Sequence, residues 1–221
     1  MKKYLISLIT ILFLLFLTNF ISAQTPCPVE GSAHLDKDKI ANRYKNREIV
    51  NYLTQPIDNS ITLEKMLEPG DDSKRFNPDS FVKIIGYIVE IKDGGKESCN
   101  CETNVDSLKD IHIYVGLTPN ADKSECVIVE VTHKWKSLNR GYNLKQYVGK
   151  QVNIYGFIFY DAEHKGNAKN TCSVCTNVWR KTVVEVHPVC KIELVKSIPF
   201  PVIWLCSRSS VYNGLHHIIS N

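Results

Sequence analysis

Two short motifs in this chain combine a carboxylate with an imidazole two residues further on. Asp110 and His112 lie in the segment DIHIYVGL, and Glu185 and His187 lie in VVEVHP. Side chains two residues apart on a β-strand point to the same face of the sheet. Each motif would therefore present an oxygen donor beside a ring nitrogen, a combination that binds divalent metals. The carboxylate could instead orient the imidazole for acid–base chemistry.

Glu130 extends this set, because it lies on the polar side of CVIVEVT, a run whose other side is valine-rich. If the three strands adjoin, the predicted divalent-metal ligands, with zinc as the candidate ion, are Asp110, His112, Glu130, Glu185 and His187. We expect His112, Glu185 and His187 to be near neighbours on one outer face. The alternative is an ordinary solvated polar face, on which a carboxylate–imidazole pair contributes about 0–1 kcal/mol.

Aromatic and basic residues form a second group of candidates, in HKWKSLNRGY and WRK. Flat rings beside cations suit stacking on bases or sugars. The predicted ligand-binding residues are Trp135, Lys136, Arg140, Tyr142, Trp179 and Arg180. The partner would be an oligosaccharide, an oligonucleotide or a protein. Alternatively, the two tryptophans cap the ends of a barrel.

Two functions remain open at this point. The first is a binding module, and the second is a metal-dependent hydrolase that uses His112, Glu130, Glu185 and His187. The sequence contains no Ser-His-Asp arrangement, nucleophile elbow or Gly-rich phosphate loop. Whether the protein is an enzyme is therefore left open.

Five β-rich runs must position these residues: 81–91, 110–117, 126–132, 151–160 and 181–195. A short helical turn is expected at 144–150, and a long loop at 161–178. Gly86 in the middle of the first run suggests a bulge or sharp bend. Five short strands with an early bend predict a mainly β fold, a small five-stranded Greek-key barrel over residues 79–196.

The segments VKIIGYIVEIKDGG and YVGKQVNIYGFIFYDAEH resemble the OB-fold over residues 80–195. The order of ESCNC, DIHI, VIVEVT, FYDAEH and VEVHPV is also similar to an exported bacterial domain of unknown function. The OB resemblance implies a ligand surface on strand faces and neighbouring loops. The second resemblance implies no activity.

The two ends of the chain predict export. Lys2 and Lys3, an apolar run and Ala23 have the layout of a secretory signal peptide at residues 1–23, with the mature chain starting at Gln24. Loss of the two lysines lowers the net charge from +4 to +2, which does not favour nucleic acid. No membrane span is expected after cleavage, because the remaining apolar runs are too short.

Two further segments flank the predicted barrel. Residues 24–78 read as a polar N-terminal extension with helices at 37–52 and 62–67, the second N-capped by Thr62. Residues 197–221 contain Pro199 and Pro201 and are expected to form an irregular tail.

The chain has eight cysteines, and an even number in an exported protein favours disulfides. The disulfide candidates are Cys99, Cys101, Cys172 and Cys175. Members of each close pair look too near in sequence to bridge one another, so we expect a cross-link between the two pairs. The alternative is a four-thiolate zinc site.

Overall fold

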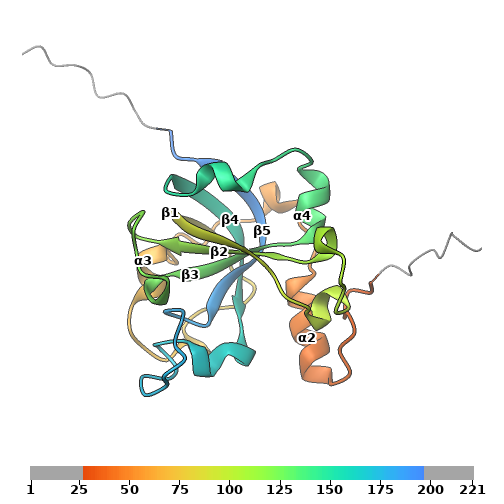
Figure 1. Cartoon of the computed structure of the whole chain (residues 1–221), viewed down its shortest axis with the longest axis horizontal. Coiled ribbons are helices and arrows are strands. Elements are labelled where there is room, and N and C mark those ends of the chain that lie inside the picture. Colours follow the sequence, from red (N-terminus) through yellow and green to blue (C-terminus); the bar gives the residue numbers. More distant parts are fainter. Residues whose placement is uncertain (1–26, 197–221) are drawn as a thin grey trace, which may run out of the picture.

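Five strands form a closed barrel in the computed structural model, which describes residues 27–196 (Figure 1). The predicted signal peptide and C-terminal tail lie outside these residues. The strands are β1 (Phe81–Asp93), β2 (Ile111–Gly116), β3 (Val127–Val131), β4 (Gln151–Tyr160) and β5 (Val184–Leu194). Their spatial order is β1-β2-β3-β5-β4, with β4 returning to β1. The mainly β, five-stranded OB-like barrel predicted from the sequence is confirmed.

One parallel strand pair closes the barrel and decides which polar residues can meet. All other neighbouring strands are antiparallel, whereas β3 runs parallel to β5, with Val129 opposite Val186. This pairing places β2, β3 and β5 side by side. The condition under which the two carboxylate–imidazole motifs would lie on one surface is therefore met.

The barrel interior contains the apolar side of each strand. The fully buried residues include Ile113 on β2, Val129 on β3, Ile154 on β4 and Val186 on β5. Burying one such side chain contributes roughly 1.5–3 kcal/mol before entropy is counted. Since alternate residues face inward, the polar residues between them must face outward.

A short helix, α3 (Leu63–Leu67), packs against β1 and β3. Thr62 is its N-cap, as predicted, and its hydroxyl accepts a hydrogen bond from the Lys65 amide at 3.2 Å. Gly86 makes room for this helix, because a Cβ there would lie 2.5 Å from the Leu63 side chain. The register shift in β1 falls between Ile88 and Glu90, so the mid-strand glycine serves close packing and does not itself mark the bulge.

The connection between β3 and β4 has more helix than the sequence predicted. A 3₁₀ turn at Leu144–Tyr147 corresponds to the expected helical element. It is preceded by α4 (His133–Leu138), which Thr132 caps through its hydroxyl. Trp135 on α4 is buried in the core, where its indole N–H donates to the Cys190 carbonyl at 3.1 Å.

The N-terminal extension folds back onto the barrel. Helix α2 (Asp36–Lys45) is shorter than the predicted 37–52, and Asn46 is its C-cap. It packs against β5 and against the 3₁₀ turn Ser98–Asn100. We call residues 27–46 the cover. Further 3₁₀ turns lie at Tyr52–Thr54, Asp72–Lys74, Asp106–Leu108, Lys123–Glu125 and Ala162–Asn167, the last within the predicted loop.

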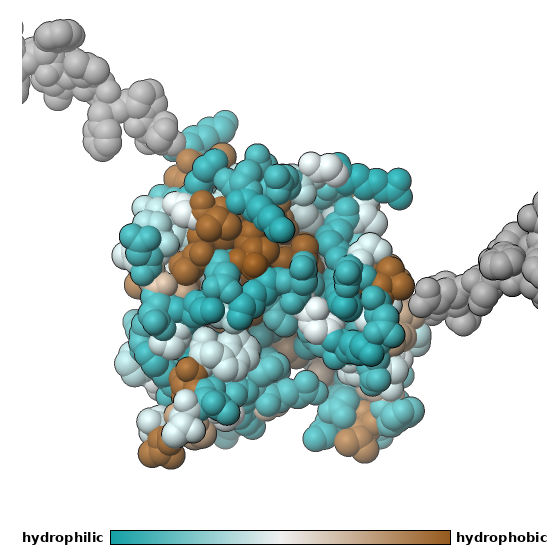
Figure 2. Space-filling model, viewed as in Figure 1, coloured by the Kyte–Doolittle hydropathy of each residue, from teal (hydrophilic) through white to brown (hydrophobic). Residues whose placement is uncertain are grey.

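The surface of the described residues is mixed in character. Figure 2 shows a face on which hydrophilic side chains surround a smaller apolar area. Between residues 27 and 196, no helix has the length and apolar character needed to cross a membrane.

Candidate metal centre

The structure brings all five predicted ligand residues together over β2, β3 and β5. His112 on β2 lies opposite Glu130 on β3, with its Nε2 atom 3.3 Å from Glu130 Oε1. His187 on β5 approaches Glu130 from the other side, with Nδ1 2.9 Å from Oε2. Its Nε2 lies 3.6 Å from Asp110 Oδ2, and its Nδ1 lies 3.7 Å from Glu185 Oε2. Strand phase therefore located this cluster correctly.

The cluster lies on the outer face of the barrel, as expected, but it is buried, so the alternative of an ordinary solvated face is wrong. Asp110 and Glu130 are each 3% exposed, Glu185 is 1% exposed, and His187 is completely buried. Only His112 retains moderate exposure, with 23% of its side chain accessible. His187 lies within β5, which continues through Pro188 to Leu194, and it is not a solvated surface residue. The reason is that the cover and the turn at residues 97–101 lie over this face.

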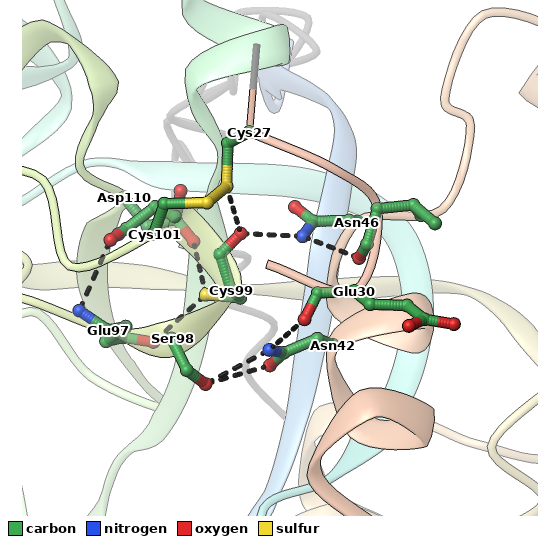
Figure 3. Close-up of a disulfide and its surroundings, with 11 residues drawn as sticks. Cys27, Glu30, Asn42, Asn46, Glu97, Ser98, Cys99, Cys101 and Asp110 are labelled. Carbon is green, nitrogen blue, oxygen red and sulfur yellow. Dashed lines mark hydrogen bonds between the residues drawn. A yellow bond between two sulfur atoms is a disulfide. The ribbon is translucent and has the colours of Figure 1, made fainter. Parts of the chain in front are cut away.

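Asn42 and Asn46 hold the cover against that turn (Figure 3), and Gly31 allows the two segments to approach closely. At Gly31, φ is +61°, and a Cβ would lie 1.8 Å from the Ser98 carbonyl oxygen, so only glycine allows this approach. Asn46 donates to the Cys99 carbonyl at 2.7 Å, and Asn42 donates to the Ser98 hydroxyl at 3.0 Å. A disulfide between Cys27 and Cys101 joins the two segments covalently.

The cover and the turn add three side chains to the cluster: the sequence analysis did not select Lys45 or Glu97, and it assigned Cys99 to a disulfide or a four-thiolate site. Lys45 at the end of α2 donates from Nζ to Glu97 Oε2 at 3.0 Å. Glu97 Oε1 also contacts His112 Nε2 at 3.1 Å. The Cys99 thiol lies 3.4 Å from Glu97 Oε2 and 3.9 Å from Asp110 Oδ2 (Figure 3). The only sequence signal was an acidic residue two positions before Cys99 in ESCNC.

Among the described residues, the cluster and its immediate neighbours contain more carboxylates than permanently charged cations. The carboxylates are those of Glu97, Asp110, Glu130, Asp161 and Glu185, and the cations are Lys45 and Arg180. Arg180 is committed to Asp161 at 3.0 Å and Glu185 at 2.7 Å, and Lys45 to Glu97. Asp110 and Glu130 are left with imidazoles as their nearest positive partners. A buried excess of negative charge requires protons or a metal ion for balance.

The pKa values reflect this charge imbalance. Burial disfavours the charged form of His187, but attraction to Glu130 outweighs burial and raises its pKa to about 10. Burial also disfavours the charged form of His112, but attraction to Glu130 and Glu97 outweighs burial and raises the pKa of His112 to about 9. Burial raises the pKa of Asp110 to about 6. Burial would raise the pKa of Glu130, but attraction to both imidazoles outweighs burial and lowers this pKa to about 2.

Hydrogen bonding in the cluster is incomplete. Neither ring nitrogen of His187 has a hydrogen-bond partner among the described residues, and the same is true of Oε2 of Glu130 and Oε2 of Glu185. The 2.9 Å approach of His187 Nδ1 to Glu130 lacks the alignment of a hydrogen bond. Buried polar groups without partners are uncommon and call for an explanation.

The ligand atoms are close enough to share an ion. Oxygen and nitrogen atoms of Asp110, Glu130 and His187 all lie within 4.8 Å of one another, and all three residues are buried. The same holds for Glu97, His112 and Glu130, and for Glu97, Cys99 and Asp110. Carboxylate oxygen, imidazole nitrogen and thiolate sulfur are the donor types that zinc takes in proteins.

The six predicted ligand-binding residues do not form one surface. Trp135, Lys136 and Tyr142 line a cleft of about 280 Å³ beside α4. Arg140 is exposed and lies outside the residues that line this cleft. Trp179 packs edge-on against Tyr114, at 6.3 Å between ring centres, and Arg180 is buried beside Glu185.

The predicted cross-link between the two cysteine pairs is wrong. Cys101 bonds to Cys27, and Cys172 bonds to its near neighbour Cys175. Cys99 is a free buried cysteine, so the four-thiolate zinc alternative is wrong as well. The cover, which the sequence treated as a separate extension, supplies the partner of Cys101.

Comparison with known proteins identifies no family for this chain. No protein-family model matches it, and no curated protein matches it. Among solved structures, yeast Stn1 and Ten1 match with a TM-score of 0.28 and 17% identity, over 53% of this chain and 43% of that one. The barrel assignment therefore rests on strand order and closure.

Two aminoacyl-tRNA synthetases are similar at the same low level. The aspartyl enzyme of Entamoeba histolytica has a TM-score of 0.29 and 12% identity, over 67% of this chain and 26% of that one. The asparaginyl enzyme of Pyrococcus horikoshii has a TM-score of 0.28 and 16% identity, over 62% and 25%. This chain spans less than half the length of each of the three matched structures. Scores this low carry no functional argument.

Proposed function

We propose that this protein is an exported OB-like module that binds a divalent metal ion in the cluster between its barrel and its cover. One observation carries the proposal: His187 is fully buried among Asp110, Glu130 and Glu185, and neither of its ring nitrogens has a hydrogen-bond partner among the described residues. A divalent ion would use one of these nitrogens and neutralise part of the surrounding charge. Zinc fits this donor set.

A satisfied buried carboxylate elsewhere in the protein makes this observation informative. Asp72 is 2% exposed and accepts hydrogen bonds from Thr182, the Val183 amide, Arg75 and Asn170, at 2.7–3.2 Å. The fold therefore satisfies a buried carboxylate fully where its role is structural. The incomplete bonding around His187 supports a role in ligand binding.

Burial of the cluster supports binding over hydrolysis. A catalytic zinc site keeps one coordination position open to water and substrate. A cleft of about 190 Å³ at the margin of the cluster is lined by Asn42, Lys45, Phe159 and Asp161. The candidate ligands Asp110, Glu130 and His187 are not among its lining residues. We therefore assign the cluster to metal binding, with the metal-dependent hydrolase as the weaker alternative.

Metal analysis of the exported protein tests the proposal. Mature protein is purified with its disulfides intact, and its metal content is measured by mass spectrometry before and after treatment with chelator and zinc. We expect one tightly bound ion per chain. His187→Gln should bind zinc about 100-fold or more weakly, because loss of even an outer-shell partner costs 10–100-fold.

His34→Gln is the matched control, since His34 is exposed and contributes to none of the ligand groups. It should bind zinc as the unchanged protein does. If the unchanged protein takes up no divalent ion, the proposal is wrong. The same holds if the two variants lose binding equally.

The cleft beside α4 favours a second candidate function, binding of an oligosaccharide or oligonucleotide. Trp135, Lys136 and Tyr142 line it together with Lys145, which combines rings and cations in one place. The test is a titration with single-stranded DNA and with neutral oligosaccharides, monitored by tryptophan fluorescence. Lys145→Glu should weaken binding of the DNA and leave a neutral sugar unaffected. An unchanged spectrum with both ligands would contradict this candidate.

Export itself also belongs to the proposal. Two disulfides among the described residues are compatible with an oxidising compartment. Sequencing of the secreted or periplasmic protein should find Gln24 at its amino terminus. A sample that retained Met1 would contradict cleavage after Ala23.

A further inference from the structure

We propose that the cluster contains two metal sites that share the Glu130 carboxylate, an outer site through which a divalent ion enters and an inner site that retains it. The outer site consists of Glu97, His112 and Glu130, and the inner site consists of Asp110, Glu130 and His187. The inference rests on the proposed metal function and adds the route by which an ion reaches a buried site.

The two oxygens of Glu130 carry the first step. In each site the ligand atoms lie within 4.8 Å of one another, and Glu130 belongs to both. Its Oε1 atom lies 3.3 Å from Nε2 of His112, whereas its Oε2 atom lies 2.9 Å from Nδ1 of His187. One carboxylate therefore faces two imidazoles from opposite sides, so that an ion held by one oxygen can pass to the other.

The two sites differ in their access to solvent, and this difference carries the second step. The side chains of His112 and Glu97 are 23% and 22% exposed, so water reaches the outer site. Asp110 and Glu130 are buried, and His187 is completely buried. A hydrated ion can therefore meet His112 and Glu97 directly, but it can reach His187 only after it has left solvent. The outer site is the solvent-facing end of the cluster.

Glu97 can bind an ion while it still holds the cover. Its Oε2 atom accepts a hydrogen bond from Lys45 at 3.0 Å, and its Oε1 atom lies 3.1 Å from Nε2 of His112. The ligand atom of the outer site is therefore Oε1, and the ion takes the place of the contact between Glu97 and His112. His112 binds the ion as a neutral imidazole, so its proton passes to solvent. When the ion moves inward, His187 releases a proton in the same way and His112 regains one.

Lys45 makes the outer site the weaker of the two. Its ammonium group lies at one oxygen of Glu97 and repels a cation that is bound to the other oxygen. In the inner site, both ring nitrogens of His187 and Oε2 of Glu130 have no hydrogen-bond partner among the described residues. The ion gains ligands there without breaking hydrogen bonds. We therefore expect it to move inward, by about 4 Å if the two positions are spaced as in two-metal sites.

Zinc titration by calorimetry tests whether there are two sites. The mature, disulfide-bonded protein is freed of metal with a chelator and titrated with zinc. We expect one tightly bound ion and a second ion that binds at least about 10-fold more weakly, because two cations repel each other across Glu130. His112→Gln should remove the weak ion and retain the tight one, whereas His187→Gln should remove the tight ion and retain the weak one.

The rate of zinc uptake tests the route. Metal-free protein is mixed with zinc in a stopped-flow instrument, and free zinc is followed with a fluorescent indicator. His112→Gln should slow association and dissociation by the same factor, about 10-fold or more, as for the loss of a metal-site partner. The affinity for the tight ion should stay nearly unchanged, because the outer site lies on the path and not at its end. A merely structural role of His112 would change that affinity instead.

His133→Gln is the matched control, because His133 is also half-buried and belongs to neither site. It should take up zinc as the unchanged protein does. Should His112→Gln fail to fold, Glu97→Gln takes its place, since the amide keeps the size of the side chain and loses the charge that attracts the ion. It should also slow uptake.

Equal uptake rates in His112→Gln and His133→Gln would overturn the route and leave the proposed function standing. Faster uptake in Glu97→Gln would also overturn it, because the ion would then enter by displacement of the cover. A protein that binds no zinc would overturn both the route and the proposed function.

Discussion

Two buried polar regions of this protein differ in how completely they are satisfied. Around Asp72, the neighbouring Arg75 and three groups from the distant segment 170–183 donate four hydrogen bonds to a single carboxylate. Around the His187 imidazole, three carboxylates lie at ion-pair distance, but both ring nitrogens and an oxygen each of Glu130 and Glu185 have no hydrogen-bond partner within the described part of the chain. The first region joins the segment before the barrel to the loop before β5. The second is the region to which we assign metal binding.

The number of hydrogen-bond partners distinguishes a structural buried polar group from one that is available to a ligand. A fully satisfied network stabilises one conformation, whereas an incomplete network lowers stability until a ligand completes it. In this protein the incomplete network lies beneath a cover that a disulfide holds in place. The comparison can be tested by substitutions in each region.

Loss of Asp72 should have the largest effect. Asp72→Ala leaves Thr182, Asn170 and the Val183 amide without their acceptor, and removes the partner of Arg75. We expect unfolding free energy to fall by about 3–5 kcal/mol in urea denaturation, with or without zinc. Asp79→Ala is the control, because the Asp79 side chain is 70% exposed and should contribute at most about 1 kcal/mol. If zinc restored the stability that Asp72→Ala loses, the Asp72 region would also belong to a ligand site, and the two regions would not differ in role.

The next largest effect should be a difference in how much each of the two disulfides stabilises the protein. Cys27 and Cys101 are 74 residues apart, and chain entropy rates such a link at about 4 kcal/mol before strain. Cys172 and Cys175 are three apart, and the same model rates their link at about 2 kcal/mol.

Replacing each pair by alanines and measuring denaturant midpoints tests this difference. Only the loss of Cys27–Cys101 should also weaken zinc binding, because only that pair holds the cover and the 97–101 turn together. Equal effects on zinc would mean that the cover does not control the site.

The metal-free protein should lose stability as pH rises. His112 and His187 have folded-state pKa values of about 9 and about 10, above the ordinary value of 6.5. Their protonated forms therefore stabilise the fold fully below about pH 6.5, and this stabilisation disappears as pH rises to about 10. We expect the free energy of unfolding to decrease by on the order of 2 kcal/mol between pH 7 and 10. The two histidines do not contribute independently, because the same Glu130 stabilises the protonated form of each.

Chelator-treated and zinc-loaded samples, unfolded in urea across this range, provide the measurement. The zinc-loaded protein should lose less, because the ion replaces the proton on His187. Parallel pH curves for the two samples would exclude His187 as the ligand.

The smallest effect should be an increase in stability. Burial raises the pKa of Asp110 to about 6, above the ordinary 3.8, so the fold loses stability as pH rises from about 3.8 to about 6, and the ionised carboxylate leaves it less stable at pH 7. Asp110→Asn removes that charge, and we expect the metal-free protein at pH 7 to gain about 1 kcal/mol. The same variant should gain less stability from zinc than the unchanged protein does. A loss of stability without metal would place Asp110 with Asp72, as a structural residue.

The sequence alone predicted the strands and the faces of this protein. Alternation of apolar and polar residues is a local property, so Ile113, Val129 and Val186 could be placed inside and His112, Glu130 and His187 outside. The same phase placed the two carboxylate–imidazole motifs on one surface once β2, β3 and β5 adjoined. Thr62 as an N-cap was equally readable, because capping depends on neighbouring residues.

Only the tertiary structure decided that the polar surface is buried. The cover docks through Gly31, Asn42, Asn46 and a disulfide whose cysteines lie 74 residues apart. No regular spacing of residues in the sequence reveals these contacts, because each one depends on two segments that are far apart in the sequence and meet only in the folded protein. Burial is what changes the chemistry: the same carboxylates and imidazoles on a solvated face would be ordinary surface residues. Beneath the cover these groups are shielded from bulk water, so protons or the metal ion that we propose must balance their charge.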